Sequence, residues 1–514
     1  MSDAGDEVAG TDADVGHHSL KARRLGIDTH DEAVVFMRKE CHVCRAEGFS
    51  AHTRVRLRHK SRSLIATLYQ VTSDILLAGE MGLSDVAWQG LGLAGGEEVS
   101  VSHPDTLESF RLIRGKVFGR RLDQKGCGTI IKDVVQGDYS DIHLSSFVTA
   151  CATRPLDRDE MIALTQAMLG AGERIRWKSD SVVDKHCVGG LPGNRTTPII
   201  VAIAAACGLF MPKTSSRAIT SPAGTADTME TMAPVDLDVP AIRRVVEREG
   251  GCVVWGGAVR LSPADDVLIR IERVLDLDAE GQLVASILSK KLAAGATRLI
   301  VDIPIGATAK VRGTEAAKAL ADSLTSVGQA FDLQTTSLFT DGSQPVGRGI
   351  GPALEARDVL SVLRGEEDAP ADLRDRALRL AGALLEMGGV ASIGNGDARA
   401  KVVLDGGEAW SKFQRICEAQ GGMRTPPQSL FRRPILSSSA GYVGTIDNRK
   451  LAKVAKLAGA PDAKAAGVEV HARLGEIIES GQPLYTIHAE SPGELAYARE
   501  FAETNDHIFE IVEQ

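Results

Sequence analysis

The sequence has few aromatic residues, no long apolar run and no basic stripe, and each shortage excludes a class of function. Phe, Trp and Tyr make up 4% of 514 residues, too few for a platform on which nucleic-acid bases stack. The longest apolar run, Ile199–Met211, is too short to cross a bilayer. The net charge is -9, and the locally basic segment Arg54–Arg62 alternates like a solvated strand face. No signal peptide opens the chain, so we expect a cytoplasmic protein that binds neither nucleic acid nor membrane.

The eight cysteines lack the regular spacing of a disulfide framework. This predicts free thiols in a reducing compartment. Cys41 and Cys44 form a single C-x-x-C without a second pair at zinc-finger spacing. We interpret them as ordinary thiols, with a metal or redox pair as the alternative.

Changes in composition and in the spacing of apolar residues divide the chain into segments. Residues 1–17 are acidic and rich in Gly, Ala and Asp, which predicts a disordered tail. Residues 18–102 are predicted to be β-rich, and helical spacing follows His103-Pro104. The predicted strands are Glu32–Arg38, Thr53–Leu57, Ser63–Gln70 and Glu98–Val101, and the predicted helices are Leu107–Arg114, Cys127–Gln136, Ile142–Ala152 and Arg158–Ala171.

From Val182 to about Val311, short apolar segments such as Cys252–Trp255 and Leu299–Ile303 alternate with helices, as in an α/β layer. Arg376–Gly389 is predicted to be a helix. Strands and turns from about Pro434 predict a small α+β unit.

One glycine-rich segment runs from Asp184 to Pro198 (DKHCVGGLPGNRTTP). Lys185 precedes the turn, and a helix is predicted to begin with Thr197 as N-cap and Pro198 at the first position. Free backbone N–H groups at such a turn favour an anion, to which Lys185 adds a charge and Thr196 or Thr197 a hydroxyl. The pattern is not a Walker A loop.

A second segment, Ser215–Glu230 (SSRAITSPAGTADTME), concentrates hydroxyls, an arginine and a Gly-Thr step. Asp227 and Glu230 have the spacing of a capping box. Hydroxyls and a guanidinium can hold phosphate from several sides. Two anion loops about 30 residues apart therefore suggest one phosphate site.

Both segments resemble the signature segments of the thymidine phosphorylase family, especially its long (type 2) branch, which includes AMP phosphorylases. The resemblance continues through IIKDVVQGDYSDIHLSSFVTAC and LVASILSKKLAAGAT. It implies an α/β fold with the two-lobe nucleoside phosphorylase architecture, plus an extra N-terminal domain found only in the long branch. The expected domains are a β-rich N-terminal domain at 18–102, a helical lobe at 105–178 plus about 262–296, an α/β phosphate-binding lobe at 179–261 and 297–433, and a C-terminal α+β domain at 434–514.

The resemblance also implies roles for individual residues. The phosphate contacts would be Lys185, Thr196, Ser215 and Thr225. The substrate contacts would be Gly190, Ser216, Arg217, Ala218, Ile219, Thr220, Ser221, Ser286, Lys290 and Lys310. Asp278 matches a proton-donor position, and His186 and Lys185 are the other catalytic candidates. We expect no metal and no cofactor, since inorganic phosphate is a co-substrate, and a homodimer or larger homo-oligomer.

The expected reaction is phosphorolysis of an N-glycosidic bond. Phosphate attacks C1′ of the sugar while an acid assists the departing base. Cys187 stands where shorter thymidine phosphorylases have a serine, Thr228 replaces a lysine, and Arg270 and Arg273 lie only near the position of the base-binding arginine. These departures, with the wording SRAITSPAGTADT, favour a nucleoside 5′-monophosphate such as AMP over the alternative, thymidine.

Two other functions stay open. A phosphoribosyltransferase of related fold would use Asp265 and Asp266 to hold Mg²⁺ with a diphosphate. A non-catalytic nucleotide-binding paralogue is supported only by Cys187. The C-terminal unit is similar to a sandwich-hybrid module but lacks the Asp-Lys tip that is lipoylated or biotinylated, so we interpret it as structural.

Overall fold

The computed structural model describes residues 18–512 apart from 31, 219–220 and 278. The predicted tail at 1–17 and the predicted site residues Ile219, Thr220 and Asp278 therefore lie outside the described residues. The chain forms two compact units, Met1–Arg120 with Thr129–Ala150, and Arg121–Gly128 with Cys151–Gln514.

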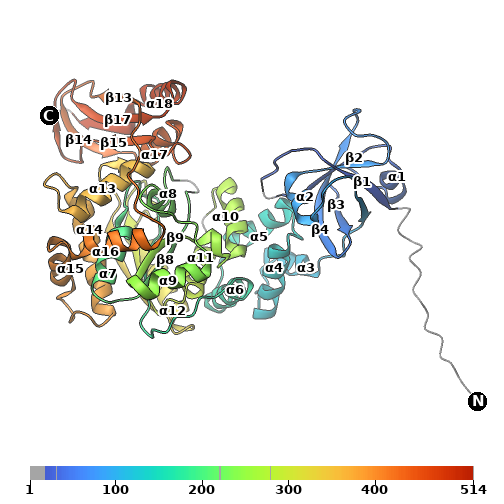
Figure 1. Ribbon diagram of the computed structural model, residues 1–514, viewed down its shortest axis with the longest axis horizontal. Helices are drawn as coiled ribbons and strands as arrows, with labels where there is room; N and C mark the ends of the chain where they lie inside the picture. The colour runs from blue at the N-terminus through green and yellow to red at the C-terminus, as the bar shows by residue number, and fades with distance from the viewer. Residues whose placement is uncertain (1–17, 31, 219–220, 278, 513–514) are drawn as a thin grey trace, which may run out of the picture. The chain divides into compact units, whose positions relative to one another are not determined.

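The first unit contains a closed six-stranded barrel with strand order β1-β5-β2-β4-β3-β6 (Figure 1). Buried Val55 and Leu57 alternate with Arg54 and Arg56 along β3. Arg54 is only 12% exposed and donates to the carbonyl of Gly137, so the face predicted to be solvated is partly covered. The predicted strands of this region correspond to β2, β3, β4 and β6. The barrel strands are β1 Ser19–Arg24, β2 Val34–Arg38, β3 Arg54–His59, β4 Arg62–Val71, β5 Glu80–Leu83 and β6 Glu98–Ser102.

Helices follow the barrel at the predicted places. Asp157 caps α6 (Arg158–Ala171), and Glu160 completes a capping box, in agreement with the acidic start in the sequence. The other helices of this part of the chain are α1 His42–Glu47, α2 Asp85–Leu91, α3 Glu108–Val117, α4 Gln124–Gln136 and α5 Asp141–Thr153.

The second unit is built on parallel strands in the order β11-β10-β7 and β8-β9. A parallel bridge between Val182 and Phe210 joins β7 to β8, giving the sequence β11-β10-β7-β8-β9. The apolar helix α7 (Thr196–Ala206) is buried in a core shared with four later helices, α13 (Pro352–Arg364), α14 (Ala371–Met387), α15 (Gly396–Asp405) and α16 (Glu408–Ala419). The strands are β7 Val183–Cys187, β8 Met211–Ser215, β9 Gly251–Trp255, β10 Arg298–Ile305 and β11 Gln334–Asp341.

Helices cover this sheet, as expected for an α/β layer. The predicted helix at Arg376–Gly389 is the end of a longer helix, α14. The helices are α7 Thr196–Ala206, α8 Thr225–Glu230, α9 Val239–Glu249, α10 Pro263–Leu275, α11 Glu280–Ala293, α12 Thr314–Gln329, α13 Pro352–Arg364, α14 Ala371–Met387, α15 Gly396–Asp405 and α16 Glu408–Ala419.

The C-terminal part is an α+β unit with its own apolar core. One antiparallel sheet has the order β12-β15-β17-β13, and a second has the order β16-β14-β18. Its elements are β12 Gly349–Ile350, β13 Phe431–Leu436, β14 Gly441–Ile446, α17 Asn448–Leu457, β15 Gly467–Val470, β16 Ile477–Ile478, β17 Pro483–Ala489, α18 Pro492–Thr504 and β18 Phe509–Val512. Across the described part of the chain, no helix combines the length and apolar character that a bilayer crossing requires.

Candidate active site

The strand order changes direction beside β7. After β7 the chain adds β8 and β9 on one side of the sheet, and it then adds β10 and β11 on the other side. Ligands of open α/β sheets bind at the carboxyl ends of the strands where such a reversal opens a crevice. Lys185 and Cys187 from β7 and Asp302 from β10 lie at this position.

Lys185 is a buried cation with incomplete pairing. Its side chain is 1% exposed, and Nζ donates a 3.0 Å hydrogen bond to Thr196 Oγ1. Asp302 Oδ2 lies 3.7 Å from Nζ. Although burial opposes its charge, Lys185 and the Thr340 hydroxyl lower the pKa of Asp302, so this carboxylate remains ionised. The network keeps the ammonium in place, and among the described residues Thr196 alone accepts a hydrogen bond from its three N–H donors.

Glycines bring the turn after β7 against two other loops. Gly190 has φ +80°, and a Cβ there would lie 2.3 Å from the backbone nitrogen of Lys310. Gly193 has φ +70°, and a Cβ would lie 2.0 Å from the carbonyl oxygen of Val346. Only glycine fits such close approaches with positive φ. Gly190 and Lys310, both predicted to contact substrate, are thus neighbours.

The helix after this turn begins earlier than predicted. Arg195 is the N-cap of α7 and Thr196 is its first residue, so the prediction of Thr197 as N-cap and Pro198 as first residue is wrong. The Thr196 hydroxyl is bonded to Lys185, which holds the start of the helix beside β7. Proline is still tolerated at the third helical position, because N–H groups of the first turn have no intrahelical acceptor.

Arg195 connects the two predicted anion loops. Its Nη1 donates a 2.7 Å hydrogen bond to Thr225 Oγ1, and its Nε donates a 2.6 Å bond to Glu355 Oε2. Because Arg195 adjoins Thr196, which is bonded to Lys185, Lys185 and Thr225 belong to one local network. Arg195 lies in the first predicted loop, but no role was predicted for it. The signal that could have revealed it is a charged residue between a glycine turn and a buried apolar helix, where a charge needs partners.

Glu355 closes this network from α13. Its side chain is 2% exposed and also accepts a 2.9 Å hydrogen bond from Thr228 Oγ1. Burial raises the pKa of Glu355, while Arg195 and Thr228 oppose the rise. Thr228, which replaces a lysine of shorter family members, is therefore a partner of this carboxylate.

Ser215 ends β8 with an unused hydroxyl. Its Oγ is inaccessible to solvent and has no hydrogen-bond partner among the described residues. Buried polar atoms are nearly always bonded, so an unpaired one at the carboxyl end of a parallel strand is a candidate ligand contact.

The loop after Ser215 holds its arginine internally. Arg217 Nη1 and Nη2 each donate a 2.8 Å hydrogen bond to Glu230, and the guanidinium lies over the ring of Trp255. These bonds raise the pKa of Arg217. Its charge is thus neutralised within the protein. Of the other described residues in this run, Ser216 is exposed, Ala218 donates its backbone N–H to Asp227, and Ser221 donates its hydroxyl to the carbonyl of Ala223.

The cap of α8 also differs from the prediction. Gly224 is the N-cap, and Asp227 at the third helical position accepts the Gly224 N–H at 2.9 Å. Asp227 therefore makes only the returning bond of a capping box, because Gly224 has no side chain, whereas the sequence suggested that Asp227 was the cap with Glu230 as its acid. The bonds of Glu230 to Arg217 and Lys464 explain the difference.

His186 lies in a cationic environment. Asp184, beside it on the strand, pairs with Lys213 at 3.2 Å and Lys291 at 2.9 Å. Burial and the positive charges of Lys291 and Lys213 lower the pKa of His186 well below its usual value. The imidazole is therefore neutral at neutral pH and can donate a hydrogen bond, but it is a weak proton source.

Two predicted base contacts share one face of α11, since Ser286 and Lys290 are four residues apart. Lys290 forms an ion pair with buried Asp265, which raises the pKa of Lys290 although burial opposes it. Asp265, offered above as part of a Mg²⁺ pair, thus has a lysine partner. The described residues contain no cluster of three or more His, Cys, Asp or Glu suited to a metal. Arg270 and Arg273 lie on the preceding helix, α10.

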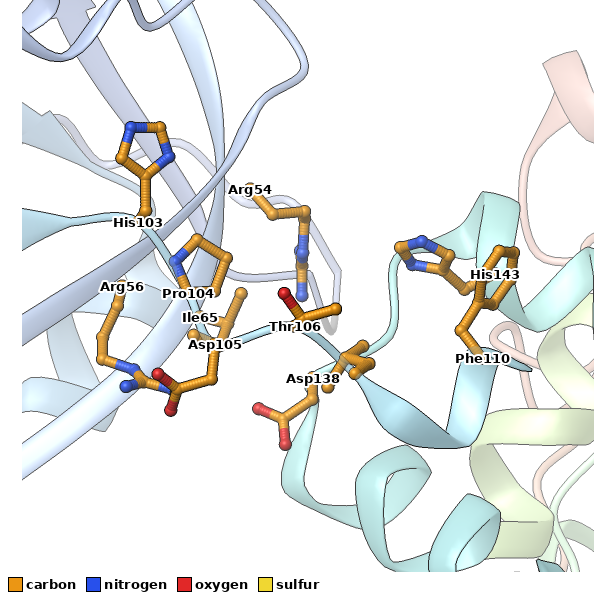
Figure 2. A pocket seen from close by; sticks show the side chains of 11 residues that line it. Arg54, Arg56, Ile65, His103, Pro104, Asp105, Thr106, Phe110, Asp138 and His143 are labelled. Carbon is orange, nitrogen blue, oxygen red and sulfur yellow. The ribbon is translucent and has the colours of Figure 1, made fainter. Parts of the chain in front are cut away.

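A separate cavity of about 500 Å³ lies within the first unit (Figure 2). Arg54 and Arg56 from β3, the linker around Asp105, and Phe110 and His143 from the helices line it. Arg56 pairs with Asp105 at 2.8 Å, and Arg54 donates to the carbonyl of Gly137. None of the predicted catalytic or phosphate-binding residues lines this cavity.

Comparison with known families agrees with this architecture. The descriptions and matched residues are a glycosyl transferase family helical bundle domain at 111–172, a glycosyl transferase family a/b domain at 179–410, and a pyrimidine nucleoside phosphorylase C-terminal domain at 442–508.

Named relatives match almost the full chain. "Putative thymidine phosphorylase 1" of Acidovorax sp. (strain JS42) is 60% identical over 495 residues, covering 96% of this chain and 97% of the relative. "Putative thymidine phosphorylase" of Polaromonas sp. (strain JS666 / ATCC BAA-500) is 59% identical over 496 residues, with coverage of 96% and 97%. These matches identify a family and leave its long branch a prediction.

A solved structure shows a related fold. Anthranilate phosphoribosyltransferase from Thermus thermophilus aligns with a TM-score of 0.50 at 20% identity, covering 60% of this chain and 98% of that one. At this identity the likeness concerns architecture alone.

Proposed function

Because the chain belongs to the thymidine and pyrimidine nucleoside phosphorylase family of glycosyltransferases, we propose that it cleaves thymidine with inorganic phosphate. The products are thymine and 2-deoxyribose 1-phosphate. The observation that carries the proposal is the network from Lys185 through Thr196 and Arg195 to Thr225, which joins the two predicted anion loops.

The phosphate site is formed by one ammonium and three hydroxyls. Lys185 supplies the charge, and Thr196, Ser215 and Thr225 supply hydroxyl donors from the starts of two helices and the end of a strand. The phosphate oxygens that accept hydrogen bonds from these donors are held in place, and a remaining oxygen can attack C1′ of the sugar. Because Lys185 and Thr196 are buried, their electrostatic attraction for phosphate is little weakened by water.

Two observations favour thymidine over a nucleoside 5′-monophosphate. The relatives at about 60% identity bear the name thymidine phosphorylase. In addition, a 5′-phosphate needs a second anion pocket, and Arg217, the arginine of the expected nucleotide-binding run, is already bonded to Glu230. The residues of the segment SRAITSPAGTADT favoured AMP, and we replace that preference with the alternative substrate, thymidine.

The leaving base is proposed to contact α11. As the glycosidic bond breaks, negative charge develops on the base, and the Lys290 ammonium, which is paired with Asp265 but has three N–H donors, can stabilise it. Ser286 on the same face can bond an edge of the base. Proton donation is assigned to Asp278 in preference to His186, since His186 is neutral at neutral pH. Gly190 and Lys310 form the neighbouring contact region for the sugar.

We also propose that the enzyme works as a homodimer or larger homo-oligomer. Two large apolar side chains of the first unit are exposed: Phe118, which follows α3, at 84%, and Ile142 on α5 at 74%. Exposed apolar side chains on neighbouring elements favour a protein contact. All eight cysteines are free thiols, which supports the predicted reducing, cytoplasmic compartment.

A substrate panel tests the proposed activity. Purified protein is incubated with phosphate and thymidine, uridine, thymidine 5′-monophosphate or AMP, and the free base is quantified by chromatography. We expect release of thymine from thymidine. Release of adenine from AMP without release of thymine would overturn the substrate assignment, and no release from any compound would overturn the activity.

A further inference from the structure

The C-x-x-C segment of the barrel has two unlike thiols. Cys41 is the N-cap residue of α1 and is partly exposed, whereas Cys44 at the third helical position is 3% exposed. Both pack with the barrel core, far in sequence from the phosphate loops. The proposed phosphorolysis makes no use of either thiol.

The two thiols are in contact with one another. The backbone N–H of Cys44 donates a 3.2 Å hydrogen bond to Cys41 Sγ. The Cys44 thiol also donates a hydrogen bond to the Cys41 sulfur. This hydrogen bond is the main reason that the pKa of Cys41 falls to about 6 and that the pKa of Cys44 rises. At neutral pH Cys41 is thus largely thiolate and Cys44 is a thiol.

Four of the other cysteines have raised pKa values instead. Burial raises the pKa of Cys187, Cys252 and Cys417 to about 12. Burial also raises the pKa of Cys207, although its side chain is partly exposed like that of Cys41. Since the thiolate is the nucleophile in disulfide exchange, reactivity should concentrate at Cys41.

A metal site would need further ligands around these thiols. The described residues contain no group of three or more His, Cys, Asp or Glu that could hold a metal ion. A partly exposed thiolate beside a buried thiol instead matches the requirements of disulfide exchange, in which one sulfur attacks and the second displaces the leaving group.

We propose that Cys41 and Cys44 form a reversible dithiol–disulfide pair that reacts with low-molecular-weight disulfides of the glutathione class. The Cys41 thiolate attacks one sulfur of the small disulfide, breaking its S–S bond and releasing one thiolate. Cys44 then loses its proton and attacks the Cys41 sulfur, expelling the second small thiolate. The pair is oxidised by two electrons, and the small disulfide is reduced to two thiols.

Peptide mass spectrometry of the full-length protein tests the exchange. The reduced protein is treated with glutathione disulfide at pH 7, blocked with an alkylating agent and digested with trypsin, which releases Glu40–Arg45 with both cysteines. We expect this peptide to lose two hydrogens and to regain them with dithiothreitol. Persistence of both thiols when glutathione disulfide is in large excess would overturn the proposal.

Two variants separate the roles of the thiols. Cys44→Ser should accumulate a glutathione adduct on Cys41, whereas Cys41→Ser should leave Cys44 unmodified. An adduct on Cys44 in Cys41→Ser, or none on Cys41 in Cys44→Ser, would contradict the assigned order. Cys207→Ser is the control and should form the disulfide as the wild type does.

A rate measurement on the unaltered protein covers the case in which a variant does not fold. At pH 7, iodoacetamide should modify Cys41 at least about tenfold faster than Cys207, since the pKa of Cys41 is lowered and that of Cys207 is raised. Equal rates would contradict the proposal. None of these measurements depends on phosphorolysis, so their outcomes are independent of the proposed function.

Discussion

At the residue scale, the ammonium of Lys185 has three N–H donors but few partners. Among the described residues, Thr196 accepts one hydrogen bond at 3.0 Å, and Asp302 lies at the longer distance of 3.7 Å. A buried ammonium with an unused donor is costly unless a ligand completes its shell. Phosphate supplies both the acceptor and the opposite charge.

Lys185→Ala therefore should remove much of the stabilisation of phosphate in the transition state. We expect a loss of about 2 to 3 kcal/mol of transition-state stabilisation, which lowers kcat/KM roughly 30- to 150-fold. Steady-state kinetics of thymine release measure the effect. The control is Lys318→Ala, which removes an exposed lysine on α12 and should leave kcat/KM unchanged. Kinetics of Lys185→Ala equal to those of the wild type would remove Lys185 from the phosphate site.

Arg195 is a positioning residue, since it bonds Thr225 and Glu355 with separate nitrogens. Lysine keeps the charge but cannot make both bonds in this geometry. Arg195→Lys should raise the KM for phosphate about tenfold while changing the KM for thymidine less than about twofold. Arg374→Lys on the surface of α14 is the matched control. Equal changes in both KM values would indicate a general structural defect instead.

Sequence reasoning proposed the phosphate contacts but did not predict how their side chains pair with one another. Lys185 and Thr196 were predicted as separate phosphate contacts, and the structure bonds them directly. Arg217 was predicted to face the substrate, but Glu230, thirteen residues later, binds its guanidinium. The choice between a ligand and an internal carboxylate depends on the path of the loop between them, and composition does not fix that path.

At the element scale, the turn after β7 is constrained by its neighbours. Gly189 and Gly190 both have positive φ, but only a Cβ at Gly190 would collide with another loop, at the backbone of Lys310. Gly189→Ala should cost about 1 to 2 kcal/mol of backbone strain. Gly190→Ala should add displacement of the Lys310 loop and reduce kcat/KM by a further factor of about ten. Identical kinetics for the two variants would contradict the role of this close approach.

The Arg217–Glu230 pair stabilises the second anion loop in a pH-dependent manner. The bond from Arg217 is the main cause that lowers the pKa of Glu230 to about 2, from an ordinary value of 4.5. A carboxylate whose pKa is lowered on folding stabilises the protein above its unfolded pKa, and this contribution disappears as the pH falls through the folded value. The stabilising contribution of Glu230 is therefore lost as the pH falls from 4.5 to about 2.

Glu230→Gln should lower stability at pH 7 by about 1 to 2 kcal/mol once solvent screening is allowed for. Thermal unfolding should show a gap in Tm from the wild type that narrows as the pH falls below 4.5. Glu315→Gln, in an exposed pair with Lys318, should show no such gap. A gap for Glu230→Gln that stays constant down to low pH would contradict the linkage.

Elements were predictable where local chemistry determines them. The start of α6 at Arg158 was predicted correctly, because the bonds of Asp157 and Glu160 that fix it lie within the first helical turn. The start of α7 was predicted two residues late, since a bond between Thr196 and Lys185 of the neighbouring strand decides it. The closure of the barrel by β1 and β6 could not be predicted from the local residue pattern either, because the pairing joins strands about 80 residues apart.

At the scale of the whole molecule, the exposed apolar side chains of the first unit predict self-association. Light scattering coupled to size-exclusion chromatography should give a mass of at least two chains. The double substitution Phe118→Ser and Ile142→Ser should shift the equilibrium toward the monomer, while Ile393→Ser, at an exposed position of the second unit, should not. A wild-type monomer at assay concentration would overturn the prediction.

The central claim is that the loops of Lys185 and Thr225 hold one phosphate and direct its oxygen at C1′ of thymidine. The most direct measurement uses phosphate labelled with ¹⁸O and follows the sugar product by mass spectrometry. The account predicts 2-deoxyribose 1-phosphate that retains every labelled oxygen, formed in equal amount to thymine and greatly reduced in Lys185→Ala. Free deoxyribose without label, released at the same rate when phosphate is omitted, would contradict it.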